Sequence, residues 1–392
     1  MTPDFGGLPN LQKLLLYQCP LIEEIHPSIG HLERLVFLLV AGCDSYKKHP
    51  SIAAIKKLEI LSLSKCSHLS KGRKEVASYR KYIKSLFVTY TGLQFISSGL
   101  RKLVLSNCHL GDEDIDWDAW DLPNLQELDL SWNKFSRLSF SSLRFRELKW
   151  LDVSLCNNLV ELLELPSNIA VLRADYCYSL ETVGDVSNCK WLWKVSLMGK
   201  NELGTSGDQK LIDSMSQGNA IKHHFMSLAL EHQIRKMSTS SQVSRSKFIL
   251  QLPQNWHSKY SGFLIHTVID YQEPYVTISI KQEIDDDDEC NYRNESFPHP
   301  PPPPTYIGYV SFSSLRQATW LNSGCNMISF YTQGMFEVKL VAWKSEGDHQ
   351  LRTNNDEASD WSEFWDEEHE DRKTFIVQHD SKSTINILWR PC

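Results

Sequence analysis

The sequence of 392 residues lacks the local patterns that mark a membrane span, a nucleotide site or a common hydrolase. Its longest apolar run, Leu35 to Gly42, is far short of the roughly 20 residues that a helix needs to cross a bilayer. No G-x-x-x-x-G-K-[ST] phosphate loop, G-x-S-x-G or H-E-x-x-H occurs. The first residues carry neither a basic nor an apolar leader segment, so no secretion signal is expected. We therefore expect no enzyme, no cofactor, no small-molecule substrate and no membrane span.

Metal-ligand spacing is also missing. The ten cysteines include no pair at the C-x₂₋₄-C spacing of a zinc site. The adjacent His223 and His224 have no cysteine or carboxylate partner at ligand spacing, and adjacent residues do not share a helix face. No metal is expected.

Acidic residues are unevenly distributed. The net charge is −7, yet residues 283–289 hold six acids and residues 346–371 hold eleven. Such runs are usually solvated loops rather than ligand sites. A proline run follows His299, and we interpret it as a loop spacer, with a ligand for a proline-binding protein as the alternative.

An L-x-x-L-x-L pattern recurs through the first half of the chain. It begins at Leu11, Leu35, Leu58, Ile83, Leu100, Leu125, Leu148, Ile169 and Leu192. All but one of the steps between these starts fall within the spacing of roughly 20–29 residues that is typical of leucine-rich repeats. One repeat cannot bury its apolar face alone, but stacked repeats share a continuous core and a parallel sheet. The pattern predicts an α/β leucine-rich-repeat solenoid of about nine repeats over residues 1–203, with the sheet on its concave face.

A small polar position supports this register. Eight residues after most of the starts stands a cysteine or an asparagine: Cys19, Cys43, Cys66, Cys108, Asn133, Cys156 and Cys177. This is the N/C position of the repeat consensus, where the side chain satisfies backbone groups of the turn. Six of the ten cysteines are thus predicted to be reduced and structural, as buried free cysteines usually are.

The side chains that alternate with the buried leucines should face out from the concave sheet. These outward positions include Tyr17, Phe37, Phe87, Lys102, Glu127, Asp129, Trp132, Trp150, Asp152, Arg173, Asp175 and Lys194. An acidic stripe of Glu127, Asp129, Asp152 and Asp175, flanked by Trp132 and Trp150, is expected in the later repeats. Exposed tryptophan and tyrosine beside charge are favoured at protein interfaces, so we expect a protein partner here. The alternative is that this strip faces the C-terminal domain or solvent.

Two irregularities interrupt the repeats. The step from Ile83 to Leu100 is shorter than the spacing of the other repeats, and the stretch Lys71 to Lys84 before it carries six bases. We interpret that stretch as a solvated excursion from the solenoid; a phosphate or nucleic-acid contact is the alternative, although nucleic acid is not the expected partner. The first repeat begins close to Met1 without a polar cap, which suggests upstream sequence or a truncated gene product.

A different pattern follows the repeats. Residues 204–246 are predicted to form a linker with a short amphipathic helix within 219–237. Residues 247–392 show the period-2 pattern of short strands, which predicts an all-β jelly-roll or immunoglobulin-like sandwich. The candidate strands are 247–252, 262–269, 275–281, 306–312, 325–331, 335–343, 374–378 and 384–389.

Two stretches carry a family resemblance. The series from Leu125-Gln-Glu-Leu-Asp-Leu-Ser through Leu165-Pro-Ser-Asn to Ala174-Asp-Tyr-Cys-Tyr-Ser-Leu-Glu resembles the last repeats of plant TIR-type nucleotide-binding leucine-rich-repeat disease-resistance proteins. Phe248-Ile-Leu-Gln-Leu-Pro, with Trp256 and Ser261-Gly-Phe-Leu-Ile, is similar to the post-repeat domain of that family, the C-JID.

The resemblance implies a recognition function. In that family the repeats and the C-JID bind pathogen effectors, so we expect an effector-sensing or guardee-sensing module in the cytoplasm, and in the nucleus as an alternative. The family's nucleotide-binding and TIR domains have no counterpart here, and their activities are not carried over. A stand-alone adaptor that binds a host protein or a full-length receptor is the second interpretation. A ubiquitin-ligase subunit is disfavoured, since no F-box-like segment precedes the repeats.

Overall fold

In the computed structural model, the chain divides into two compact units, residues 1–192 with 202–207 and residues 193–201 with 208–392. The structure describes residues 1–43, 45–46, 55–65, 99–112, 122–140, 145–184, 186, 189, 191–199, 225–230, 247–254, 256–268, 276–282, 305–315, 327–331, 335–342, 375–381 and 384–389. Each unit is described by itself below.

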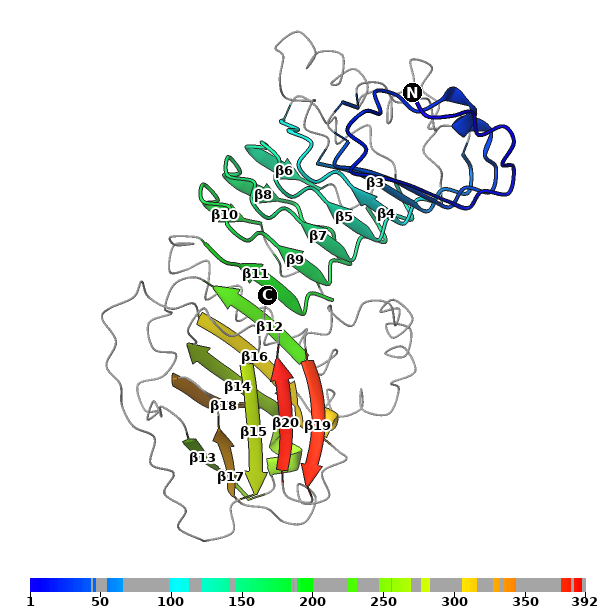
Figure 1. The fold of residues 1–392 in the computed structure, drawn as a ribbon. Helices are drawn as coiled ribbons and strands as arrows, with labels where there is room; N and C mark the ends of the chain where they lie inside the picture. Colours follow the sequence, from blue (N-terminus) through cyan, green and yellow to red (C-terminus); the bar gives the residue numbers. More distant parts are fainter. Residues whose placement is uncertain are drawn as a thin grey trace. The chain divides into compact units, whose positions relative to one another are not determined.

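The first unit is a stack of coils whose strands form one parallel sheet (Figure 1). Within its described residues the strands are β1 (Lys13–Tyr17), β2 (Phe37–Ala41), β3 (Ile60–Ser64), β4 (Lys102–Val104), β5 (Glu127–Asp129), β7 (Trp150–Asp152) and β9 (Val171–Arg173). One leucine of each strand lies in a single row, and all but the first are fully buried: Leu14, Leu38, Leu61, Leu103, Leu128, Leu151 and Leu172. The predicted stacking of the leucines into a shared core is confirmed.

The outer side of this unit is not helical where it is described. The short strands β6 (Arg137–Ser139), β8 (Glu161–Leu163) and β10 (Thr182–Val183) form a second parallel sheet there, and η1 (Pro27–His31) is a 3₁₀ turn. Backbone groups bond between coils, as when Val160 N donates to Ser136 O at 2.8 Å. The α part of the α/β prediction is therefore wrong for these residues, because the return segments satisfy their backbone in the next coil.

The irregular step is resolved by the pairing of β3 with β4. Ile60 lies opposite Lys102 in parallel register, so no strand from the intervening chain separates them in the sheet. The repeat strand expected to begin at Ile83 falls within a segment that the structure does not describe, so it stays a prediction. Residues 66–98, which include Phe87, lie outside the described residues.

Each coil leaves its strand through a left-handed residue. The turn position has φ between 50° and 63° in seven coils: Gln18, Gly42, Lys65, Asn107, Trp132, Leu155 and Tyr176. Six of these are not glycine, and such residues cost about 1 kcal/mol or more each in this conformation. In six of the seven coils, from Gln18 to Leu155, the N–H of the turn residue donates to a carbonyl oxygen of the next coil, for example Trp132 N to Ser154 O at 2.9 Å. Stacking thus holds a conformation that a single coil would not keep.

The cysteine and asparagine side chains tie each coil to the one before it. The thiols of Cys43, Cys108, Cys156 and Cys177 lie 3.1 to 3.4 Å from the carbonyl oxygens of Leu16, Leu63, Leu130 and Val153 respectively. Asn133 replaces the thiol with an amide that donates to Leu105 O and Leu130 O at 2.9 and 2.7 Å. These cysteines are free, as predicted, while Cys66 lies outside the described residues.

The second unit contains two sheets (Figure 1). One includes β11 (Lys194–Leu197), β12 (Phe225–Leu230), β16 (Thr305–Ser311), β14 (Tyr260–Val268) and β18 (Met335–Ala342), in that order. The other has the order β13 (Lys247–Gln251), β17 (Met327–Tyr331), β15 (Val276–Gln282), β20 (Thr384–Trp389) and β19 (Phe375–Ser381). A short helix, α4 (Trp256–Lys259), and a 3₁₀ turn, η5 (Phe312–Leu315), adjoin β14 and β16. A strand lies in each of the eight ranges expected from the sequence.

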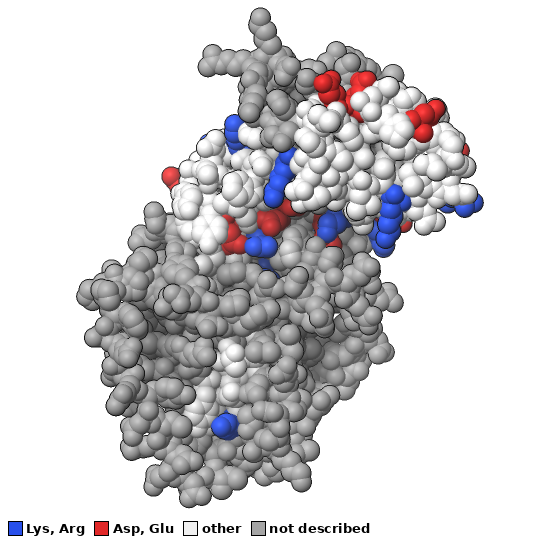
Figure 2. All heavy atoms as spheres, in the orientation of Figure 1, with Lys and Arg blue, Asp and Glu red and all other residues white. Residues whose placement is uncertain are grey.

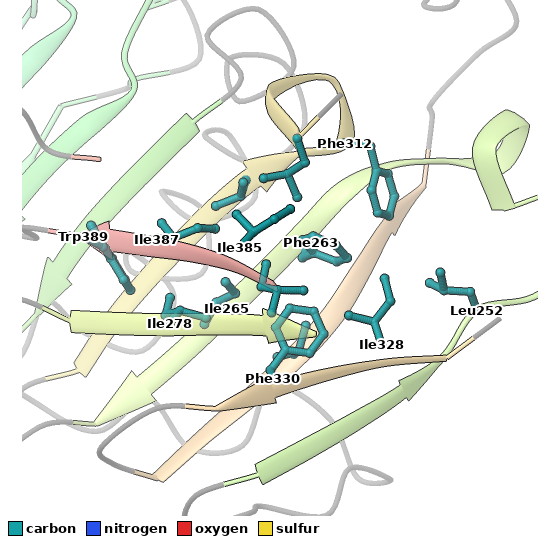
Figure 3. Close-up of a cluster of buried hydrophobic side chains, with 14 of the residues drawn as sticks. Leu252, Phe263, Ile265, Ile278, Phe312, Ile328, Phe330, Ile385, Ile387 and Trp389 are labelled. Carbon is teal, nitrogen blue, oxygen red and sulfur yellow. The ribbon is translucent and has the colours of Figure 1, made fainter. Parts of the chain in front are cut away.

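The two sheets of this unit share one apolar core (Figure 3). Phe263 of β14 stacks edge-on against Phe330 of β17, with ring centroids 5.1 Å apart. Trp389 is fully buried, and its indole N–H donates to Ser227 Oγ at 2.9 Å, so its one polar atom is satisfied. A Cβ on Gly308 would lie 3.0 to 3.2 Å from the Trp389 ring, which explains the glycine there.

The predicted amphipathic helix is a strand where it is described. Phe225–Leu230 forms β12, parallel to β11 and antiparallel to β16. Ser227, Leu228 and Ala229 are all fully buried. Burial on both faces removes the period-2 signal, and the apolar spacing then matches a helix equally well. The pairing with neighbouring strands, not local propensity, decides the structure of this segment.

Candidate recognition surface

In the sheet of the repeat unit, two rows of side chains flank the leucine row, one on either side. All of them are at least partly exposed except Ser62 and Val171, which are buried. By strand register, one row consists of Lys13, Phe37, Ile60, Lys102, Glu127, Trp150 and Val171. The other consists of Leu15, Leu39, Ser62, Val104, Asp129, Asp152 and Arg173. We call these two rows together the inner face. Their character changes along the stack, from apolar at β1–β3 to charged at β4–β9.

The apolar end of the inner face is open. Leu15 and Tyr17 of β1 are 58% and 62% exposed, and Phe37 and Leu39 of β2 are half-buried. Alternation in the sequence also places Leu15 and Leu39 on this face, although the partner-binding set expected from the sequence includes only Tyr17 and Phe37 of these four residues. The period-2 pattern predicts their position, because they alternate with the half-buried Leu14 and the buried Leu38 and Val40.

The charged end is a set of ion pairs rather than a free acidic stripe. Lys102 Nζ lies 2.7 Å from Glu127 Oε2. Arg173 contacts Asp152 at 3.6 Å and Asp175 at 3.2 Å. In Figure 2, basic and acidic side chains lie next to one another over the later repeat strands. The predicted stripe is therefore wrong as a surface of one sign, since two of its four acids share one guanidinium and a third pairs with a lysine.

Asp129 and Asp152 lie directly opposite each other on β5 and β7. Burial raises the pKa of the Asp152 carboxyl, and the Asp129 charge adds to this, while the Arg173 guanidinium acts in the opposite direction. Asp129 accepts a bond from Ser131 N at 2.9 Å, and no cation of the described residues forms an ion pair with it. Like charges that face each other across strands are destabilising, so this pair favours a cation at its open side.

The tryptophans differ from one another. Trp132 is 56% exposed and stands on the left-handed turn after β5. Trp150 is half-buried in β7. Of the two tryptophans expected to flank the acidic stripe, Trp132 lies at the edge of the inner face and Trp150 lies within it.

Two of the predicted outward residues are buried. Asp175 is 4% exposed and stands after β9, where its carboxylate accepts from Arg173. Lys194 belongs to the second unit and is 7% exposed. The alternation continues only as far as each strand does, and Asp175 lies beyond the end of its strand.

One cluster resembles a catalytic triad but lacks its geometry. His26 Nδ1 lies 2.8 Å from Ser28 Oγ and 3.6 Å from Asp4 Oδ1. In a triad the carboxylate and the hydroxyl use different ring nitrogens, so that the imidazole relays a proton between them. Here both partners use Nδ1, and Ser28 Oγ also accepts from Phe5 N at 2.8 Å. The cluster fastens the N-terminal segment to η1.

The buried thiols offer no nucleophile. Burial raises the pKa of both Cys156 and Cys177 to about 12, so they stay protonated and act as hydrogen-bond donors. Among the described residues, no group of three or more His, Cys, Asp or Glu side chains is placed to hold a metal ion. The residues that the structure describes also include no helix that is both long and apolar enough to cross a membrane.

Comparisons with known proteins agree with the repeat pattern. Residues 10–195 match the leucine-rich-repeat family of disease resistance proteins similar to RPS4B. The TMV resistance protein N of Nicotiana glutinosa is 30% identical over 172 residues, which is 44% of this chain and 13% of that protein. Disease resistance protein RML1B of Arabidopsis thaliana is 35% identical over 184 residues, which is 46% of this chain and 17% of that protein.

A solved structure, the leucine-rich-repeat domain of the type III effector XopL, covers 48% of this chain and 68% of its own. That domain is 17% identical in sequence to this chain, with a TM-score of 0.33. The chain spans less than a fifth of the length of the two plant relatives. The first half of this chain is thus a leucine-rich-repeat region similar to those of plant disease resistance proteins.

Proposed function

We propose that this chain is a protein-recognition module of a plant immune receptor, and that its inner face binds a pathogen effector or a guarded host protein. The observation that carries the proposal is the open inner face, on which Tyr17 is 62% and Leu15 58% exposed, within a region similar to disease-resistance repeats. Large exposed apolar and aromatic side chains on a rigid sheet are typical of protein interfaces.

Residues 247–392, which make up most of the second unit, are proposed to be a C-JID-like domain. Residues 204–246, which include β12, are proposed to link it to repeats over 1–203. Two sheets around one core support a jelly-roll or immunoglobulin-like sandwich. We propose that it contributes to the same recognition event.

The protein is further proposed to act inside the cell, in the cytoplasm or the nucleus. Six free cysteines among the described residues support this, because secreted proteins usually pair theirs.

Proximity labelling in plant leaves infected with a pathogen tests the proposal. The full chain, fused to a labelling enzyme, is compared with a Tyr17→Ser/Trp132→Ser variant and with an Arg137→Ser control. Arg137 is exposed on the outer strand β6. We expect a set of proteins that the control labels as strongly as the unchanged chain, that the inner-face variant loses, and that bind the purified chain directly. Identical labelling by all three would refute an inner-face recognition function.

A further inference from the structure

We propose that the inner face selects a protein segment of mixed character, with an apolar group at one end and an arginine or lysine side chain at the other. This inference rests on the proposed function and adds the chemistry of the partner. The apolar group would lie on Leu15 and Leu39, and the cation would lie at Asp129.

Apolar side chains are exposed at the β1–β2 end of the inner face. Leu15 and Leu39 are neighbours in one row, and Tyr17 stands two residues further along β1. Leu15 and Tyr17 are more than half exposed, so they leave apolar area on a sheet face. Burying such area contributes about 25 cal/mol per Å², which favours an aliphatic or aromatic partner there.

At the β4–β9 end of the inner face, the charges are unequally paired. Among the described inner-face residues, Lys102 is held by Glu127 at 2.7 Å, and Arg173 is shared by Asp152 and Asp175. Among the described residues, none forms an ion pair with Asp129, which lies opposite Asp152 across β5 and β7. A partner cation at Asp129 would relieve the repulsion of the two carboxylates, whereas a partner anion would increase it.

The distance between the apolar end and Asp129 limits the length of the partner segment. Leu15 lies on β1 and Asp129 on β5, four strand steps away in the same row. At about 4.8 Å per step the two positions are ~19 Å apart. An extended segment covers that distance with about six residues and a helix with about thirteen. The turn residue Trp132 borders the charged end, where its ring face suits a guanidinium.

Panning random peptides of about 16 residues, long enough for either conformation, on the full chain tests this inference. Peptides are first depleted on a chain that carries Leu15→Ser and Asp129→Asn. We expect the enriched peptides to carry Leu, Phe or Trp and an Arg or Lys, separated by about six or about thirteen residues. Enrichment of acidic peptides, or of none, would overturn the inference.

Matched variants then assign each end. Asp129→Asn should weaken binding of a selected peptide about tenfold, with a control in Glu181→Gln, an exposed acid beside the outer strand β10. Leu15→Ser should weaken it about tenfold, with a control in Leu21→Ser, which is 88% exposed but lies outside β1. Circular dichroism of each variant, compared with the unchanged chain, detects a loss of fold. Salt should weaken binding to the unchanged chain more than to Asp129→Asn.

The outcomes separate the two proposals. If peptides lose affinity with Leu15→Ser but not with Asp129→Asn, the mixed chemistry is wrong while inner-face recognition stands. If Leu15→Ser and Leu21→Ser behave alike and Tyr17→Ser has no effect, inner-face recognition fails as well.

Discussion

In the repeat unit every strand pairs with the strand of an adjacent coil, whereas in the second unit strands far apart in the sequence lie side by side. Lys13 of β1 faces Phe37 of β2, and the same contact recurs coil after coil. Lys247 of β13 faces Tyr331 of β17, and Phe225 of β12 faces Val310 of β16. Stability in the first unit should therefore be distributed over coils, and stability in the second should depend on a few shared residues.

Gly262→Ala in the second unit is expected to have a large effect. A Cβ at Gly262 would meet the carbonyl oxygen of Val310 and lie 2.7 Å from Ser311 Cα, both backbone atoms that cannot step aside. We expect a loss of several kcal/mol in the free energy of unfolding, in the range of severe overpacking (~3 kcal/mol or more). Urea unfolding measures it. Gly7→Ala, where the Cβ would meet nothing within 4 Å, should leave the curve nearly unchanged. Equal curves for the two variants would contradict the packing described for β14 and β16.

Removing one buried side chain from each unit tests whether the two units differ in how far a local defect spreads. Leu128→Ala and Trp389→Ala each remove a fully buried side chain and should each cost about 3 to 5 kcal/mol. Hydrogen exchange should show faster exchange confined to β4, β5 and β7 for Leu128→Ala. For Trp389→Ala, protection should fall together across both sheets of the second unit. A uniform loss across the repeat unit would mean that its coils do not act as separate neighbours.

The cysteine and asparagine side chains that connect neighbouring coils should contribute unequally to stability. Asn133 accepts from Cys108 N and Leu110 N at 3.2 and 3.0 Å, and its amide nitrogen lies within donating distance of three carbonyl oxygens. Asn133→Ala leaves several buried polar groups unsatisfied and should cost roughly 3 kcal/mol. Cys156→Ala removes one thiol contact and a small apolar group, for about 1 kcal/mol. Thermal unfolding of the two variants should rank them in this order; the reverse order would reject the asparagine as the stronger tie.

The smallest expected effect concerns the pH dependence of Asp152. Burial raises its pKa in the folded chain above the ordinary value of 3.8, so the folded state binds this proton more tightly than the unfolded state does. The carboxyl therefore destabilises the fold above its folded pKa, and this contribution disappears as pH falls towards the unfolded value. The stability of the unchanged chain relative to Asp152→Asn should decline as pH rises through that window. Urea midpoints at several pH values measure this, and a relative stability that rises with pH would mean that the Arg173 pair outweighs burial.

How far the sequence predicts the structure differs between the two units. The leucine rows and the cysteine position follow from spacing alone, because every coil repeats the same environment. The same pattern also fits a start at Ile83, and the local sequence does not reveal that β3 pairs directly with β4. The strand at Phe225–Leu230 depends on long-range pairing with β16, which no local pattern encodes.

For the candidate surface, alternation places the aromatic and charged residues on one face, but it does not assign their partners. The sharing of Arg173 by Asp152 and Asp175 depends on the register between coils. The burial of Asp175 depends on where β9 ends. Both properties depend on residues that are distant in the sequence but close in space. For this reason the expected acidic stripe is a set of ion pairs in which Asp129 takes no part.

Hydroxyl-radical footprinting of the full chain with a bound protein from the labelling experiment tests the central claim most directly. Tyr17 and Tyr178 are both 62% exposed, but only Tyr17 belongs to a strand of the inner sheet. We predict that the partner protects Tyr17 and Trp132 from oxidation and leaves Tyr178 as reactive as in the free chain. Protection of Tyr178 with Tyr17 and Trp132 still fully reactive would contradict recognition by the inner face.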